Sequence, residues 1–156
     1  MFKINVITVG KIKEDYFKKA VDEYLKRLTR FAEVKITELD EVTFSKEEGH
    51  QETILKKEEE KILPLLKGKV VCLAIEGKQF SSEEFSNFFV KAKTEGVSEM
   101  TFVIGSSYGL SKEIKKRANL LLSFSKMTFP HQMFRVILLE QIYRAFMIEN
   151  GSSYHK

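Results

Sequence analysis

LLLSFSKMTFPHQMFRVILLEQIYRAF, residues 120–146, is the stretch that decides the fold. It opens with an apolar run, residues 120–122, that is typical of a buried strand. A polar loop follows from Ser123, and Pro130 then precedes a long helix expected over residues 131–150. The loop has no evident structural role and the helix is apolar on nearly every side. We therefore predict that this stretch is the active region of the chain.

The polar residues of the last helix fall on two opposite sides of it. At 100° per residue, His131 lies near Arg135, whereas Glu140, Gln141 and Arg144 lie on the other side. The rest of the circumference is apolar, and a small sheet covers only one face of a helix. The uncovered apolar surface predicts a second copy of the chain, in a homodimer.

Arg135 has no acidic residue three or four positions away, whereas Arg144 can pair with Glu140, four residues before it. A partly buried arginine without a local partner usually meets an anion, a substrate or another chain. The alternative is a surface arginine that extends its charged end into water. Arg135 is therefore a candidate functional residue.

Strand and helix patterns alternate along the rest of the chain. Apolar, β-branched runs predict strands over residues 2–9, 32–39, 70–75 and 100–104. Helical spacing or capping signals predict helices over residues 16–31, 51–63, 82–95 and 112–119, with a loop over 40–50 and a turn over 76–78. This order predicts one α/β domain over residues 1–156, with a mainly parallel sheet and helices on both faces.

The composition is that of an ordinary globular protein, with 43% hydrophobic and 31% charged residues. The single cysteine, Cys72, lies in the apolar run VVCLAI and is expected in the core. A chain without a disulfide framework suits a reducing cytosol, so we expect a cytoplasmic protein. No run approaches the ~20 apolar residues of a membrane span.

Positive charge gathers near the end of the chain. Residues 112–156 hold eight basic and three acidic side chains, whereas residues 71–111 hold three basic and five acidic ones. This distribution suits a polyanionic partner such as a nucleic acid, although a solvated basic face would give the same count.

Several well-known chemical motifs are missing. The sequence has no GxGxxG and no GxxxxGK[ST], so it carries neither a dinucleotide-binding fingerprint nor a P-loop. His50, His131 and His155 lack metal-ligand spacing, so no metal site is expected. The glycine-bearing turn GSSYG, residues 105–109, follows a buried strand, where open α/β sheets collect ligands. The residues alone thus indicate a binding or transferase domain, with a nucleic acid as a candidate substrate.

Four segments resemble one known family. They are LSFSKMTFPHQMFRVILLEQIYRAF (122–146) with the closing Tyr154-His155-Lys156, FVIGSSYGLS (102–111), LAIEGKQFSS (73–82) and VITVGKIKEDYFKKAVDEYLKRL (6–28). Together they resemble the RlmH family, ribosomal RNA large subunit methyltransferases of the SPOUT class. The resemblance covers essentially the whole chain.

The resemblance implies an α/β fold with a C-terminal trefoil knot, a cofactor, S-adenosyl-L-methionine, bound in that knot, and a homodimer. It also implies methylation of N3 of a pseudouridine in 23S rRNA on the assembled ribosome. Two alternatives stay open: a SPOUT-class tRNA methyltransferase, and a non-catalytic ribosome-binding protein that uses the basic C-terminal third.

The resemblance also implies where the cofactor and the catalytic groups lie. The cofactor is expected against the following residues: Leu73, Gly105, Leu122, Ser123, Phe124, Ser125, Lys126, Met127, Thr128 and Phe129. The catalytic candidates are His131, Arg135, Tyr154 and His155, and the last two belong to a tail expected to close over the site. Where the family commonly has a second glycine, this chain has Ser106, which fits without strain only if its φ is negative.

Overall fold

A five-stranded sheet in the order β2-β1-β4-β3-β5 lies at the centre of the computed structural model, which describes residues 1–42 and 51–156. Every neighbouring pair of its strands is parallel. The strands are β1 (Phe2–Val9), β2 (Ala32–Leu39), β3 (Lys69–Gln79), β4 (Glu99–Ile104) and β5 (Leu120–Ser123). The helices are α1 (Asp15–Leu28), α2 (Gln51–Ile62), the short 3-10 helix η1 (Leu63–Leu65), α3 (Ser82–Thr94), α4 (Lys112–Arg117) and α5 (His131–Glu149).

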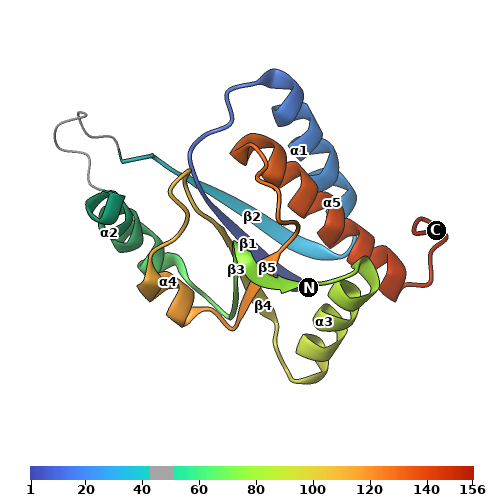
Figure 1. The fold of residues 1–156 in the computed structure, drawn as a ribbon. Helices are drawn as coiled ribbons and strands as arrows, with labels where there is room; N and C mark the ends of the chain where they lie inside the picture. Colours follow the sequence, from blue (N-terminus) through green and yellow to red (C-terminus); the bar gives the residue numbers. More distant parts are fainter. Residues whose placement is uncertain (43–50) are drawn as a thin grey trace.

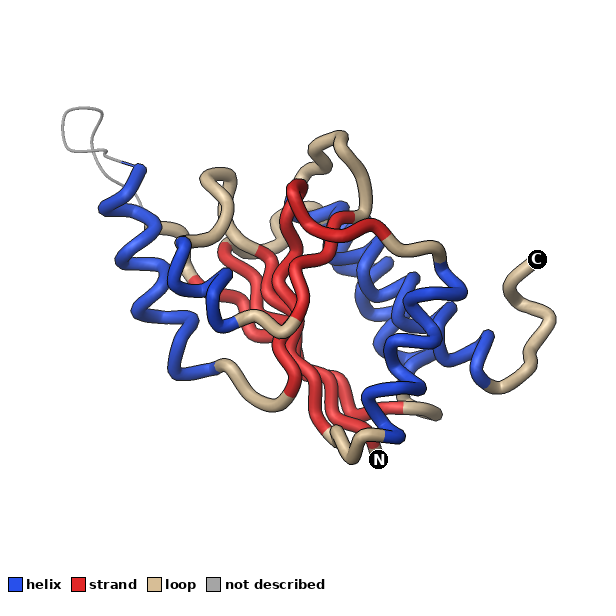
Figure 2. The backbone as a smooth tube through the Cα atoms, turned by 60° about the horizontal axis from the view of Figure 1, so that its bottom comes forward, coloured by secondary structure: helices blue, strands red, loops and turns tan. Residues whose placement is uncertain are grey.

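Helices cover both faces of this sheet, as predicted. Helices α1, α3 and α5 lie on one face and α2 and α4 on the other (Figures 1 and 2). Each face has its own apolar core: Phe89, Phe102 and Phe146 belong to the larger one, and Ile62 and Ile114 to the smaller one. The α/β class and the parallel sheet are therefore confirmed.

Local signals account for most of the element boundaries. The Ser81 side chain accepts a hydrogen bond from the Glu84 N–H, and the Glu84 carboxylate accepts one from the Ser81 N–H, which completes a capping box at the start of α3. Ser111 caps α4 through the Ile114 N–H, although that helix ends at Arg117 and not at residue 119. Of the loop predicted over residues 40–50, residues 43–50, including His50, lie outside the described residues.

The turn predicted over residues 76–78 is wrong, because β3 continues through it to Gln79. The pairing of β3 with β5 shifts register between Leu73 and Lys78. A Cβ on Gly77 would lie 2.6 Å from the carbonyl carbon of Leu121, so glycine is what lets the two backbones approach here. The irregular pairing keeps β3 beside β5 beyond its buried part.

The last helix, α5, packs against α1 and α3 on the larger core, and Leu138, Leu139 and Ile142 are fully buried. Phe146 is buried as well, whereas other apolar side chains, such as Met133, keep part of their surface exposed. In the described part of the chain, no helix combines the length and hydropathy that crossing a membrane requires.

Candidate functional site

A cavity of about 680 Å³ lies where β3, β4 and β5 end. These three strands are neighbours in a parallel sheet, so their carboxyl ends meet at one edge. Segments at the ends of these three strands, and two single residues, form the walls of the cavity. The segments are residues 73–76 of β3, residues 104–110 at and after the end of β4, and residues 122–125 and 127–131 at and after the end of β5; the single residues are Lys115 and Phe134. Ligands of open α/β folds bind at such an edge.

The residues expected to hold a cofactor lie around this cavity. Nine of the ten line it, and only Lys126, whose side chain is exposed, does not. Most of the lining residues that were not predicted lie within five positions of a predicted one, as Ala74 follows Leu73. Lys115 comes from α4 and forms an ion pair with Glu76, a contact between distant segments that no local pattern reveals.

The turn after β4 forms one wall of the cavity. A Cβ on Gly105 would lie 2.3 Å from the carbonyl oxygen of Gly109, so position 105 admits no side chain. The Gly109 N–H donates to the Ser106 carbonyl oxygen at 2.8 Å, and Gly109 has a φ of +83°. Among the described residues only glycines have positive φ, so Ser106 meets the condition set for it.

The loop after β5 is internally hydrogen-bonded. Ser123 Oγ donates to the Ser125 carbonyl oxygen at 3.1 Å, and the Met127 N–H donates to Ser125 Oγ at 3.0 Å. The Phe124 and Phe134 rings pack with centroids 5.2 Å apart, which joins the loop to α5. The loop thus presents its backbone and Phe124 to the cavity.

His131 is the first residue of α5, directly after Pro130, and lines the same cavity. Burial lowers the pKa of its imidazole below the ordinary value, and nearby Arg135 acts in the same direction. The ring is therefore neutral at neutral pH and can accept a proton.

Arg135 lies beside this cavity, not in its wall. Its side chain is 1% exposed, and its Nη1 lies 2.7 Å from Glu38 Oε2 while its Nη2 donates to the Gly10 carbonyl oxygen at 3.2 Å. Arg135 therefore has no local acidic partner, as predicted, and the anion that it meets is a carboxylate of its own chain. Glu38 is 97 residues away in the sequence and is brought to Arg135 by β2.

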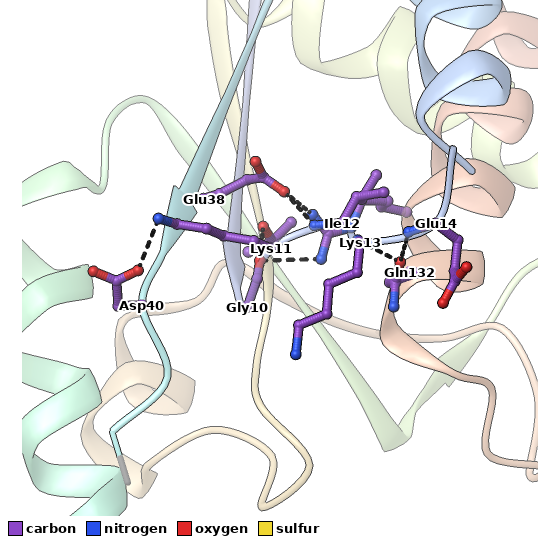
Figure 3. Close-up of polar contacts among 10 residues, drawn as sticks. Gly10, Lys11, Ile12, Lys13, Glu14, Glu38, Asp40 and Gln132 are labelled. Carbon is purple, nitrogen blue, oxygen red and sulfur yellow. Dashed lines mark hydrogen bonds and ion pairs between the residues drawn. The ribbon is translucent and has the colours of Figure 1, made fainter. Parts of the chain in front are cut away.

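Glu38 belongs to a network that also holds the segment between β1 and α1 (Figure 3). Its Oε2 accepts from the Ile12 N–H at 2.8 Å, and Gln132 Oε1 accepts from the N–H groups of Lys13 and Glu14 at 2.8 and 3.1 Å. The start of α5 is thereby tied to the ends of β1 and β2, next to the cavity.

Tyr154 and His155 pack on their own chain, far from the cavity. The Tyr154 ring meets Tyr143 edge-on at 5.0 Å, and the Arg144 guanidinium lies 4.8 Å from the Tyr154 ring centre. His155 contacts Arg144 at 3.1 Å and Glu83 at 2.6 Å. Arg144 also pairs with Glu140, as predicted, but its contacts with the tail were not foreseen.

His131 in the cavity wall and Tyr143, on which the tail packs, are 12 residues apart on α5, about 18 Å along the helix. Figure 1 shows the chain turning back after the end of α5. Of the four catalytic candidates, the single chain therefore places only His131 in the cavity wall. In the described part of the chain, no group of acidic, histidine or cysteine side chains could hold a metal ion.

A parallel α/β sheet with a cavity at its carboxyl edge is a fold that many enzymes share, and comparison with known proteins gives the class. The family model described as "Predicted SPOUT methyltransferase" matches residues 2–155. A probable methylase family protein from Haemophilus influenzae shares the fold, with a TM-score of 0.59 and 13% identity over 98% of this chain and 70% of that one. The class is that of the SPOUT methyltransferases.

Two curated relatives narrow this class to a family. Proteins named "Ribosomal RNA large subunit methyltransferase H" from Streptococcus gordonii and Streptococcus mutans are 52% and 49% identical to this chain, each over 99% of both chains. The chain belongs to this RlmH family, as the sequence resemblance indicated. Membership of the SPOUT class implies the C-terminal trefoil knot, an exception to the usual absence of knots.

Proposed function

We propose that this protein is an S-adenosyl-L-methionine-dependent methyltransferase that methylates N3 of a pseudouridine in 23S rRNA on the assembled ribosome, in the cytoplasm. The observation that carries the proposal is the cavity at the ends of β3, β4 and β5, in a chain of the RlmH family. The relatives' names speak of large-subunit ribosomal RNA, which supports the substrate class.

The residues of the cavity fit the cofactor. Its volume of about 680 Å³ lies within the ~300–1,000 Å³ usual for small-molecule sites. Leu73, Leu122 and Phe124 offer apolar walls for an adenine, and the close-packed turn at Gly105 brings backbone groups to the ligand. When bound, the cofactor supplies an electrophilic methyl group.

The N3 atom of the target base carries a proton that must leave when the methyl group arrives. His131 is neutral and lines the cavity, so it is suited to accept a proton there. We assign Tyr154 and His155 to the same step, with one chain's tail serving the other's cavity. Arg135, bound to Glu38 and Gly10, contributes by holding the start of α5 in place.

A homodimer is part of this proposal. Ile75, Tyr108 and Met127 line the cavity and yet are 52%, 48% and 75% exposed, so its rim is apolar and open. Exposed apolar surface of this kind is commonly covered by a partner or a ligand. A second copy that covers this rim would also bring a tail to it.

Calorimetry and a methyl-transfer assay together test the proposed function. We expect the purified chain to bind S-adenosyl-L-methionine and to transfer its methyl group to assembled ribosomes that lack the modification, and not to tRNA. Transfer to tRNA would favour the tRNA methyltransferase, and absence of cofactor binding would leave a ribosome-binding protein.

A further inference from the structure

Two consecutive carboxylates on α2, Glu58 and Glu59, are buried on the face of the sheet opposite α5. Their residues are only 3% and 5% exposed, although each carries an ionisable group. The next residue, Glu60, is exposed, as is usual for glutamate. Burial of two neighbouring carboxylates costs stability unless each has a partner.

Both carboxylates accept a hydrogen bond from a serine, and the two serines lie at the two ends of a segment that forms one wall of the cavity. Ser106 Oγ donates to Glu58 Oε1 at 2.7 Å, and Ser111 Oγ donates to Glu59 Oε1 at 2.7 Å. Ser106 lines the cavity, whereas Ser111 caps α4 just beyond the lining residue Leu110. Helix α2 therefore holds the segment 106–111 at both of its ends.

The two contacts are not equivalent. Glu59 is also paired with Lys56 at 2.9 Å, whereas among the described residues no ion pair to Glu58 is present. Burial raises the pKa of Glu58, and the hydrogen bond from Ser106, the backbone of Val42 and the charge of Lys61 oppose this in part. Within the same part of the chain, Glu58 Oε2 is buried without a hydrogen-bond partner.

An acidic side chain kept in such surroundings costs stability that a packed apolar residue would not. Its short hydrogen bond from Ser106 leads to the cavity wall. The turn that it reaches is tightly folded, because a Cβ on Gly105 would lie 2.3 Å from the Gly109 carbonyl oxygen. A small shift of Ser106 would consequently move the wall that faces the ligand.

We propose that Glu58 is a positioning residue for the cofactor cavity, holding the turn at Ser106 in the conformation that binds the ligand. This inference rests on the proposed function, since it takes S-adenosyl-L-methionine to be the occupant. Glu58 does not line the cavity, so it acts through Ser106 and touches neither cofactor nor substrate.

The experiment compares Glu58→Ala with Glu58→Gln, which keeps an acceptor for Ser106, and with Glu60→Ala, the same deletion at an exposed site on the same helix. Calorimetry gives the Kd for S-adenosyl-L-methionine, and methyl transfer to ribosomes gives KM for the cofactor and kcat. Glu58→Ala should raise Kd and KM about tenfold, the worth of one hydrogen bond to a carboxyl group. Its kcat at saturating cofactor should stay near that of the wild type, and the other two variants should bind normally.

A Ser106→Ala background shows whether the effect passes through Ser106. There, Glu58→Ala should weaken cofactor binding no further. Wild-type affinity in folded Glu58→Ala would overturn the proposal, and so would an equal loss in the Ser106→Ala background or a fall in kcat alone.

If Glu58→Ala does not fold, the cofactor affinity of Ser106→Ala alone tests the proposal. Weaker binding of S-adenosyl-L-methionine by Ser106→Ala supports the proposal, and unchanged binding overturns it. A wild-type chain that binds no cofactor would refute the proposed function itself, and this inference with it.

Discussion

Gly105 and His131 show how single positions shape the cavity. Gly105 leaves no space for even one methyl group, because the Gly109 carbonyl oxygen fills that space. His131 lies at the opposite wall, where burial keeps its imidazole uncharged. Gly105 therefore limits the shape of the cavity, and His131 places an uncharged imidazole in its wall.

Gly105→Ala should damage binding more than it damages the fold. The new Cβ must displace the turn, which costs about 1–3 kcal/mol as overpacking does, and the displaced wall should lower cofactor affinity at least about tenfold. Gly96→Ala is the control for cofactor affinity: Gly96 does not line the cavity and nothing lies within 4 Å of the added Cβ, so its φ of +88° costs stability without moving the wall. Calorimetry and urea unfolding measure the two effects, and full affinity in folded Gly105→Ala would contradict the assignment.

His131 should make stability depend on pH. Because its pKa is lower in the folded chain than the ordinary 6.5, the unfolded chain binds more protons, and stability must fall as pH drops below about 6.5. The free energy of unfolding of the wild type, minus that of His131→Gln, should therefore decrease between about pH 7 and pH 5. Urea unfolding at several pH values tests this, and a difference that rises on acidification would contradict it.

At the scale of elements, the start of α5 is fastened to the ends of β1 and β2. Arg135 binds Glu38 and the Gly10 carbonyl oxygen, and Gln132 binds the N–H groups of Lys13 and Glu14. These contacts set the direction in which α5 leaves the cavity. The helix can thus carry His131 at a fixed place.

The Arg135–Glu38 pair predicts an asymmetric response to mutation. Glu38→Ala leaves the guanidinium, 1% exposed, without its counter-charge and should cost about 3 kcal/mol. Arg135→Met should cost less, because the Glu38 side chain is 36% exposed and water can solvate it. Urea unfolding of both variants and of the double variant measures this, and a larger loss for Arg135→Met would contradict the account.

The sequence allowed most strands and helices to be predicted, since their signals are local. Runs such as residues 100–104 and caps such as Ser81 act within a few residues. The order of the strands could not be predicted, because β1 lies between β2 and β4 through contacts distant in the chain. Gly77 was interpreted as part of a turn, because the backbone that it lets approach, at Leu121, is also distant in the sequence.

The same division holds for the candidate site. Residues that follow strands could be placed by the carboxyl-edge rule and the family resemblance, and they line the cavity. The partner of Arg135 could not be identified from the sequence because it lies 97 residues away. The Glu58–Ser106 bond was missed since nothing in a helical charge run distinguishes a buried glutamate from an exposed one.

At the scale of the molecule, the candidate catalytic groups are divided between the two ends of α5. His131 lines the cavity, while Tyr154 and His155 pack near the other end of α5, on Tyr143, Arg144 and Glu83. One chain cannot unite them without unpacking its tail. A dimer in which each tail serves the other chain's cavity resolves this separation.

Deletion of residues 154–156 should leave cofactor binding largely intact and abolish methyl transfer. Mixing this chain with the Gly105→Ala chain should restore activity, because a mixed dimer holds one intact cavity and one intact tail. About a quarter of the sites should then be complete after random exchange of subunits. A methyl-transfer assay measures this, and an active tail-less chain would refute a catalytic tail.

Mass-spectrometric mapping of large-subunit rRNA from cells with and without this protein tests the central claim most directly. We predict that one pseudouridine of 23S rRNA carries a methyl group on N3 only when the protein is present, and that a plasmid copy restores it whereas the tail-less variant does not. Identical methylation of the large-subunit rRNA in both strains would contradict the account.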